Sequence, residues 1–167
     1  MKNKTSSLDM RPQELPYINS PPKDNSTDIN ELFIYTDGAA QGNPGAAGAG
    51  IVFTDAQGQI IKEEKYFLGK TTNNAAEYKA LILALEKARQ FKPKQIKIFM
   101  DSELVVRQLQ GDYKVRNLGL KTLNAEVRNL LLNFPKYIIN YIEREKNKRA
   151  DKLAKEAILE KVGQARR

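Results

Sequence analysis

The sequence predicts one α/β domain built on a mixed β-sheet that is covered by helices. Its 167 residues are enough for a single domain with a substantial hydrophobic core. Three strand-like segments come first, and strands then alternate with segments whose apolar residues recur at helical spacing. Consecutive strands pair as an antiparallel meander, whereas strands separated by crossover helices pair in parallel. The element order βββαβααβα therefore predicts a mixed sheet.

The meander is predicted from three strands at residues 32–36, 49–55 and 59–68. They are rich in β-branched and aromatic residues, and a turn at Ala56-Gln57-Gly58 joins the last two. Five glycines lie between Gly38 and Gly50. Because glycine lets a backbone approach another group closely, this stretch is expected to lie against something beside Asp37. The alternative is a glycine-rich hairpin in which Asp37 only ends a strand.

The remaining elements are predicted from changes of period and from stop signals. In the first helix, at residues 75–91, Tyr78, Leu81 and Leu85 share one face, and Lys92-Pro93 ends the run. Thereafter we expect a strand at 95–100, a helix at 102–110, a basic connection at 112–119, a helix at 120–133, a strand at 136–142 and a helix at 148–161.

The chain ends differ in composition from this domain. Residues 1–30 hold four of the seven prolines and few apolar residues, so a flexible tail is expected there. The alternative for that segment is a docking peptide anchored by Leu15, Tyr17 and Ile18. The domain is expected at residues 31–162, followed by a basic end at 163–167. No apolar run reaches the roughly 18 residues of a membrane span, so we expect a cytoplasmic protein without a membrane partner.

The composition restricts the chemistry that the chain can perform. It contains neither cysteine nor histidine. This excludes a disulfide framework, thiolate zinc sites, cysteine nucleophiles and the commonest general base. Carboxylates, lysine, tyrosine, hydroxyls and oxygen-bound cations remain. The chain carries 28 Lys and Arg against 20 Asp and Glu, a formal charge of +8, which favours nucleic acid as the partner.

Four acids are predicted to meet at one edge of the sheet. Asp37 and Asp101 follow predicted strands, and the carboxyl ends of parallel strands meet at the same edge. Glu77 and Asp151 lie in the first turns of their helices, from which they would reach that edge. Because clustered carboxylates repel one another, the arrangement favours Mg²⁺ or Mn²⁺ between them. Two such ions about 4 Å apart cleave phosphodiesters without a side-chain nucleophile.

Each acid also has a purely structural explanation. Asn74 and Glu77 have the spacing of a capping box, and Asp101 is placed to cap the helix that follows it. Asp151 has the position of an ordinary solvated helix charge. Glu103 is left out of the metal set, because residues i and i+2 do not share a helix face. No acid taken singly is specific for a metal site.

Four segments in order resemble the type 1 ribonuclease H family. They are TDGAAQGNPGAAGAG at 36–50, TTNNAAEYKALILAL at 71–85, MDSELVVRQLQGDYKV at 100–115 and REKNKRADKLAKEAI at 144–158. The resemblance implies the ribonuclease H fold, a five-stranded mixed sheet with helices on both faces. It also implies that Asp37, Glu77, Asp101 and Asp151 are the catalytic acids and bind two metal ions when substrate is present.

The resemblance further implies contacts to nucleic acid. Asn43 and Asn74 would contact the RNA strand, where short amides can read the 2′-hydroxyl, and Thr72 with Asn73 would bind a phosphate of the DNA strand. A basic connection contributes further DNA-strand contacts, for which the alternative is a solvated charged loop; its residues are Lys114, Arg116 and Asn117.

In one respect the chain departs from the family pattern. Many members carry a histidine on a loop before the last catalytic acid, whereas residues 145–150 contain none. This places the turnover rate and the late steps of the reaction in question, but not metal-dependent hydrolysis. The hypothesis is that Arg144, Lys146 or Arg149 replaces the histidine electrostatically, with Arg149 counted among the nucleic-acid contacts.

The sequence thus predicts a monomeric endonuclease that hydrolyses the RNA strand of RNA/DNA hybrids with Mg²⁺ or Mn²⁺ and leaves 3′-hydroxyl and 5′-phosphate ends. Two alternatives stay open. One is a hybrid-binding module without catalytic activity, and the other is a nuclease of the same fold that acts on double-stranded RNA or branched DNA.

Overall fold

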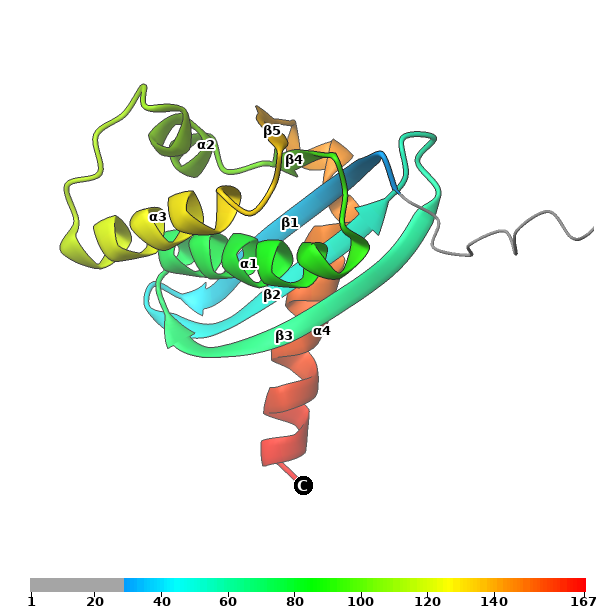
Figure 1. Ribbon diagram of the computed structural model, residues 1–167. Coiled ribbons are helices and arrows are strands. Elements are labelled where there is room, and N and C mark those ends of the chain that lie inside the picture. Colours follow the sequence, from blue (N-terminus) through cyan, green and yellow to red (C-terminus); the bar gives the residue numbers. More distant parts are fainter. Residues whose placement is uncertain (1–28) are drawn as a thin grey trace, which may run out of the picture.

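A computed structural model describes residues 29–167 (Figure 1). The tail and the docking peptide expected near the N-terminus lie outside these residues, apart from Ile29 and Asn30. The described chain forms one five-stranded sheet in the order β3-β2-β1-β4-β5, with both parallel and antiparallel pairs. The mixed sheet predicted from the sequence is therefore confirmed.

The central strand is β1 (Glu31–Gly42), and it pairs with strands of both orientations. On one side it runs antiparallel to β2 (Gly45–Thr54), which pairs in turn with β3 (Ile60–Thr71). On the other side it runs parallel to β4 (Gln95–Met100), which is parallel to β5 (Lys136–Tyr141). The antiparallel meander and the parallel half thus meet at β1.

Helices cover both faces of the sheet, as expected. On one face α1 (Asn73–Ala88) packs against β1 and β2, and α3 (Leu118–Leu131) packs against α1. The short helix α2 (Glu103–Gln110) contacts both of these helices and β5. On the opposite face α4 (Lys148–Ala165) crosses β1, β2 and β3 (Figure 1). None of the helices within residues 29–167 combines the length and hydrophobicity needed to cross a bilayer.

The main hydrophobic core lies between the sheet and α1. Apolar side chains that alternate along the strands, such as Leu32 and Ile34 on β1 and Ile96 and Ile98 on β4, are fully buried there. Tyr78 is buried in the same core, where its hydroxyl donates to Gln108 Oε1 on α2 at 2.7 Å. These contacts fix α1 and α2, which flank the edge of the sheet where the predicted acids lie.

The glycine-rich stretch is the main difference from the prediction. It forms two paired strands, with β1 continuing through Asp37 to Gly42 and β2 beginning at Gly45, so Asp37 does not end a strand. The predicted close approach is correct, but the groups approached are the chain's own helices. A Cβ on Gly38 would lie 2.2 Å from the carbonyl carbon of Ala76 in α1, and one on Gly50 would lie 2.0 Å from the carbonyl oxygen of Ala150 in α4.

Other boundaries differ by a few residues. Helix α1 begins two residues earlier than predicted and is followed by a 3₁₀ turn at Arg89–Phe91. Helix α3 begins at Leu118, because the side chain of Asn117 accepts the N–H of Leu120 and caps the helix. Helix α4 continues to Ala165 instead of ending at residue 161, so the separate basic end expected at 163–167 is largely helical.

Candidate active site

Two acids are brought together by the parallel pairing of β1 and β4. In that pairing Thr36 lies opposite Met100, and the residues that follow them are Asp37 and Asp101. Beyond Met100 strand β4 stops, whereas β1 continues. The two carboxylates therefore lie side by side where β4 ends, as the edge-of-sheet argument predicts.

Glu77 reaches the same edge from α1. Its Oε2 accepts a hydrogen bond of 3.2 Å from the N–H of Gly38, the residue after Asp37. The capping explanation for Glu77 is wrong, because Thr72 caps α1 by accepting the N–H of Ala75 at 3.2 Å. One carboxylate oxygen each from Asp37, Glu77 and Asp101 lies within 4.8 Å of the others.

The capping explanation for Asp101 is wrong as well. The cap of α2 is Ser102, whose Oγ accepts the N–H of Val105 at 3.4 Å. Neither Asp101 nor Glu77 is therefore needed to start a helix. Their position beside Asp37 calls for a different explanation, and a shared cation provides one.

Asp151, in the first turn of α4, joins the other three acids in a cleft of about 450 Å³. Its side chain is 19% exposed and lines the cleft together with that of Asp37. Two positively charged side chains lie beside Asp151. Lys155 Nζ donates to Asp151 Oδ2 at 2.8 Å, and Arg144 Nη2 lies 4.0 Å from Asp151 Oδ1. Asp151 is thus a cleft residue and not a freely solvated helix charge.

The proximity of the acids changes their proton affinities. Burial, together with the charge of Asp101, raises the pKa of Asp37 from 3.8 to about 8. Burial and the charges of Asp37 and Asp101 raise the pKa of Glu77 well above its ordinary value. Burial alone would also raise the pKa of Asp151, but the hydrogen bond from Lys155 and further favourable contacts lower it. A divalent cation would relieve this repulsion, so the donor set fits a metal site.

Asparagines expected to contact nucleic acid join the hairpin between β1 and β2 to the start of α1. Asn43 Oδ1 accepts the N–H of Asn73 at 3.1 Å, and Asn73 Oδ1 accepts the N–H of Ala40 at 3.1 Å. Asn73 and Asn74 also line the acid cleft. The structure therefore places Asn73 and Asn74 next to the carboxylates, and Asn43 is joined to them through Asn73.

A second groove of about 640 Å³ adjoins the cleft between α1 and α3. Asn74 lines both cavities, and Thr72, Asn43 and Asn117 line the groove together with Lys79, a residue outside the predicted set. Lys114 and Arg116 are on the connection before α3 and do not line the groove. The groove carries hydroxyl, amide and ammonium groups, which suit a phosphate.

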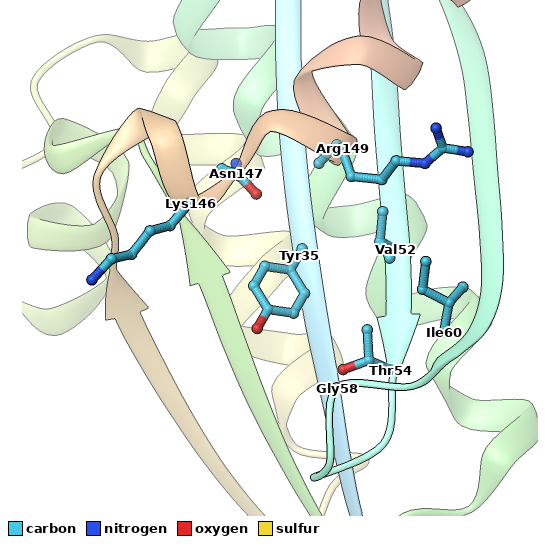
Figure 2. A pocket seen from close by; sticks show the side chains of 9 residues that line it. Tyr35, Val52, Thr54, Gly58, Ile60, Lys146, Asn147 and Arg149 are labelled. Carbon is cyan, nitrogen blue, oxygen red and sulfur yellow. The ribbon is translucent and has the colours of Figure 1, made fainter.

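Arg149 does not lie in the acid cleft. It forms a two-armed ion pair with Glu63 on β3, at 2.5 and 2.6 Å, and lines a separate pocket with Tyr35 and Ile60 (Figure 2). Lys146 lines that pocket too. Of the three cations suggested as a replacement for the missing histidine, only Arg144 lines the cleft.

Two residues near the acids were missed by sequence reasoning. Lys155 follows Asp151 by four residues, a spacing at which helical side chains meet, and that signal was available. Asn147 is buried and donates its side-chain amide to the carbonyl oxygen of Thr36 at 2.9 Å. Nothing in the local sequence distinguishes Asn147 from an ordinary surface asparagine.

The chain is similar in sequence to a known protein family and to ribonuclease H proteins. The model of a family described as "Reverse transcriptase-like" matches residues 35–157. Ribonuclease HI of Halobacterium salinarum is 42% identical over 124 residues, which are 74% of this chain and 62% of that protein. A bifunctional protein of Mycobacterium tuberculosis is 36% identical over 129 residues, which are 77% of this chain and 35% of that protein. The chain thus spans less than two thirds of either relative.

The fold is similar to solved structures over nearly their whole length. The crystal structure of LC11-RNase H1 in complex with an RNA/DNA hybrid superposes with a TM-score of 0.75 at 46% identity, covering 78% of this chain and 99% of that one. The match includes the mixed sheet and the helices on both of its faces.

Proposed function

The chain belongs to the type 1 ribonuclease H family, and from that premise we propose that it is an endonuclease that hydrolyses the RNA strand of RNA/DNA hybrids. The products would carry 3′-hydroxyl and 5′-phosphate ends. The observation that carries the proposal is the convergence of Asp37, Glu77 and Asp101 within 4.8 Å, with Asp151 in the same cleft. A hybrid bound to LC11-RNase H1, whose fold this chain shares, supports the choice of substrate.

The four acids would hold Mg²⁺ or Mn²⁺. Bound divalent ions supply an activated water and stabilise the oxygen that leaves. The chain's own contribution is to fix the carboxylates before substrate arrives: β1 and β4 hold Asp37 and Asp101, and the Gly38 N–H holds Glu77. Preorganised charge of this kind is a large part of enzymatic rate enhancement.

The groups around the acids suit the two strands of a hybrid. Arg144 and Lys155 line the cleft and bring positive charge to the scissile phosphate. Asn73 and Asn74 lie beside the acids, where amides can recognise a 2′-hydroxyl. The adjoining groove with Thr72 and Asn117 would receive a phosphate of the DNA strand. A duplex would therefore lie across α1, with its RNA strand over the acids.

The proposal is tested with labelled RNA/DNA hybrid and purified protein. We expect cleavage with Mg²⁺ or Mn²⁺ and none with EDTA. Asp37→Asn or Asp101→Asn should abolish cleavage and keep hybrid binding, because each removes a charge from the metal site and no helix cap. Full activity in either variant would refute the assignment. Binding by the parent without cleavage under any divalent metal would favour a hybrid-binding module.

The substrate range is tested in a separate experiment. Parallel assays on hybrid, double-stranded RNA, branched DNA and DNA with a single ribonucleotide compare kcat/KM for one enzyme preparation. We expect the hybrid to be cleaved fastest, since the amides next to the acids suit an RNA strand and the groove suits a DNA phosphate. Faster cleavage of double-stranded RNA would assign the chain to a different substrate class.

The proposal also includes a monomer that acts in the cytoplasm. Light scattering during size-exclusion chromatography tests the oligomeric state. Fractionation of cells that express the full chain tests the location.

A further inference from the structure

Aromatic side chains lie on the sheet surface beside α4, and among them Tyr35 packs against the cluster that contains Ala150 and Leu153 of that helix. Residues that pair across strands point to the same side, and the pairs Phe33↔Lys97↔Ile138 and Tyr35↔Phe99 therefore share the face opposite α1. Helix α4 covers β1, β2 and β3 on this side (Figure 1). We call Phe33, Tyr35, Phe99 and Ile138 the aromatic face.

The aromatic face is a continuous surface. The rings of Tyr35 and Phe99 stack with centroids 4.8 Å apart, and Phe33 lies 5.4 Å from Phe99. Ile138 at its margin is 39% exposed. Large apolar side chains that lie together and remain accessible are typical of a binding surface.

The aromatic face continues into the pocket of Figure 2. Tyr35 lines this pocket of about 220 Å³, with Val52 and Ile60 on the far side and Lys146 at its margin. Ile60 is 53% exposed. A ligand on the aromatic face would therefore find an apolar recess beyond Tyr35 large enough for one side chain.

We propose that the chain's own N-terminal segment, at residues 12–18, docks on the aromatic face, with Leu15, Tyr17 and Ile18 as anchors. This segment has the sequence PQELPYI, two prolines with three large apolar residues. Proline-containing segments dock on aromatic-lined surfaces, because the fixed φ angle of proline lowers the entropy lost on binding. The apolar residues and prolines of the segment thus suit the aromatic face.

The length of chain outside the described residues also supports this occupant. β1 begins at Glu31, and Phe33 and Tyr35 follow within four residues, a rise of about 13 Å along a strand. Twelve residues separate Ile18 from Glu31, and a linker of that length can reach about 40 Å at most. Such a tether gives an effective concentration on the order of 1 mM, so an intrinsic dissociation constant of about 0.1 mM would leave the segment docked about nine-tenths of the time.

Charge is consistent with the same occupant. Two lysines flank the surface: Lys97, whose Nζ lies 5.3 Å from the Phe33 ring centroid, and Lys146 at the pocket margin (Figure 2). The segment carries Glu14 directly before its anchors. Lys97 already has Glu31 Oε2 at 3.8 Å, so a carboxylate approaching Lys146 would orient the segment on the face.

The first test uses a single tryptophan in the full chain, which has none of its own. In Tyr17→Trp we expect blue-shifted emission and reduced acrylamide quenching. Adding Ile138→Asp should weaken docking about tenfold, which would expose the tryptophan, because it places a charge in the contact. Adding Leu132→Asp, at an 80% exposed position after α3, should change nothing. Solvent-exposed emission in Tyr17→Trp, or equal effects of the two aspartates, would overturn the proposal.

The second test locates the segment. The chain has no cysteine, so Ser20→Cys, two residues after the last anchor, accepts one nitroxide label. We expect broadening of the amide signals of residues 33–35, 97–99 and 137–139, and no such pattern when the label is at Gln164→Cys at the end of α4. Mixing spin-labelled protein without ¹⁵N with unlabelled ¹⁵N protein separates the occupants: docking within one chain leaves the mixture unbroadened, whereas the same local broadening in the mixture would assign the face to a second copy. Absence of local broadening in both samples would also refute docking. Neither result depends on nuclease activity.

Discussion

The side-chain amide of Asn147 donates a hydrogen bond of 2.9 Å to the carbonyl oxygen of Thr36, and both residues are buried. Thr36 directly precedes Asp37 on β1. The backbone carbonyl oxygen of Asn147 accepts the N–H of Asp151 at 3.1 Å. One residue therefore links the strand that carries one acid to the helix that carries another.

Asn147→Ala should lower both stability and catalytic rate. Removing the amide leaves the buried Thr36 carbonyl without this donor, which costs about 1–3 kcal/mol. Because the same bond positions Asp37 relative to Asp151, kcat should fall more than KM rises. Urea unfolding and steady-state kinetics measure the two effects. Asn129→Ala, at an exposed position on α3, is the matched control. Parent-like stability together with a parent-like kcat in Asn147→Ala would show that Asn147 does not couple Asp37 to Asp151.

The metal-free protein should lose stability as pH rises. The pKa of Asp37 is about 8 in the folded chain and 3.8 ordinarily. Between these values the unfolded chain has released the proton while the folded chain keeps it, so unfolding releases a proton and the free energy of unfolding falls with pH. The loss is complete above about pH 8. Thermal melts in EDTA from pH 5 to 9 should show a falling Tm.

The same reasoning predicts that Asp37→Asn stabilises the metal-free protein at pH 8, by on the order of a few kcal/mol, since the repelled charge is removed. The variant should also flatten the pH dependence of Tm. In the parent, Mg²⁺ should raise Tm more at pH 8 than at pH 5, because the cation favours the ionised acids. Glu126→Gln, an exposed change on α3, is the control. A Tm that rises with pH in EDTA would contradict the assigned pKa shift.

The sequence predicted the sheet and the meeting of four acids at its edge, because both depend on patterns that can be recognised in the sequence. Alternating strands and helical spacing identified the elements, and Asp37 and Asp101 followed from parallel pairing. The glycine-rich stretch was expected to follow the end of a strand at Asp37, but it forms two paired strands. The sequence does not separate these cases, because glycine is favoured both in a loop and in a strand on which a helix packs closely. Only coordinates reveal which group approaches, here Ala76 for Gly38 and Ala150 for Gly50. Side-chain direction was equally inaccessible: Arg149 points to Glu63 and Arg144 toward Asp151.

Gly50→Ala should destabilise the fold severely. The added Cβ would lie 2.0 Å from the carbonyl oxygen of Ala150 and 2.8 Å from the N of Ala154, both backbone atoms of α4 that cannot move without shifting the helix. We expect a loss of about 3 kcal/mol or more in urea unfolding, the upper range of overpacking. The matched control is Gly163→Ala on α4 itself, where a Cβ meets nothing within 4 Å and helix propensity should add about 0.5–1 kcal/mol. Equal effects of the two alanines would show that α4 does not rest on Gly50.

Arg144→Ala and Arg149→Ala should separate a group of the acid cleft from a structural ion pair. Arg144 lines the cleft with Nη2 4.0 Å from Asp151, so its loss should lower kcat/KM on hybrid about tenfold, the range of one charge-assisted contact to a phosphate. Arg149 is held by Glu63 outside the cleft, so its variant should keep the parent single-turnover and steady-state rates. Steeper salt dependence of kcat/KM in the parent than in Arg144→Ala would support a phosphate contact. A large rate loss in Arg149→Ala with none in Arg144→Ala would reverse the two roles and restore Arg149 as the replacement for the missing histidine.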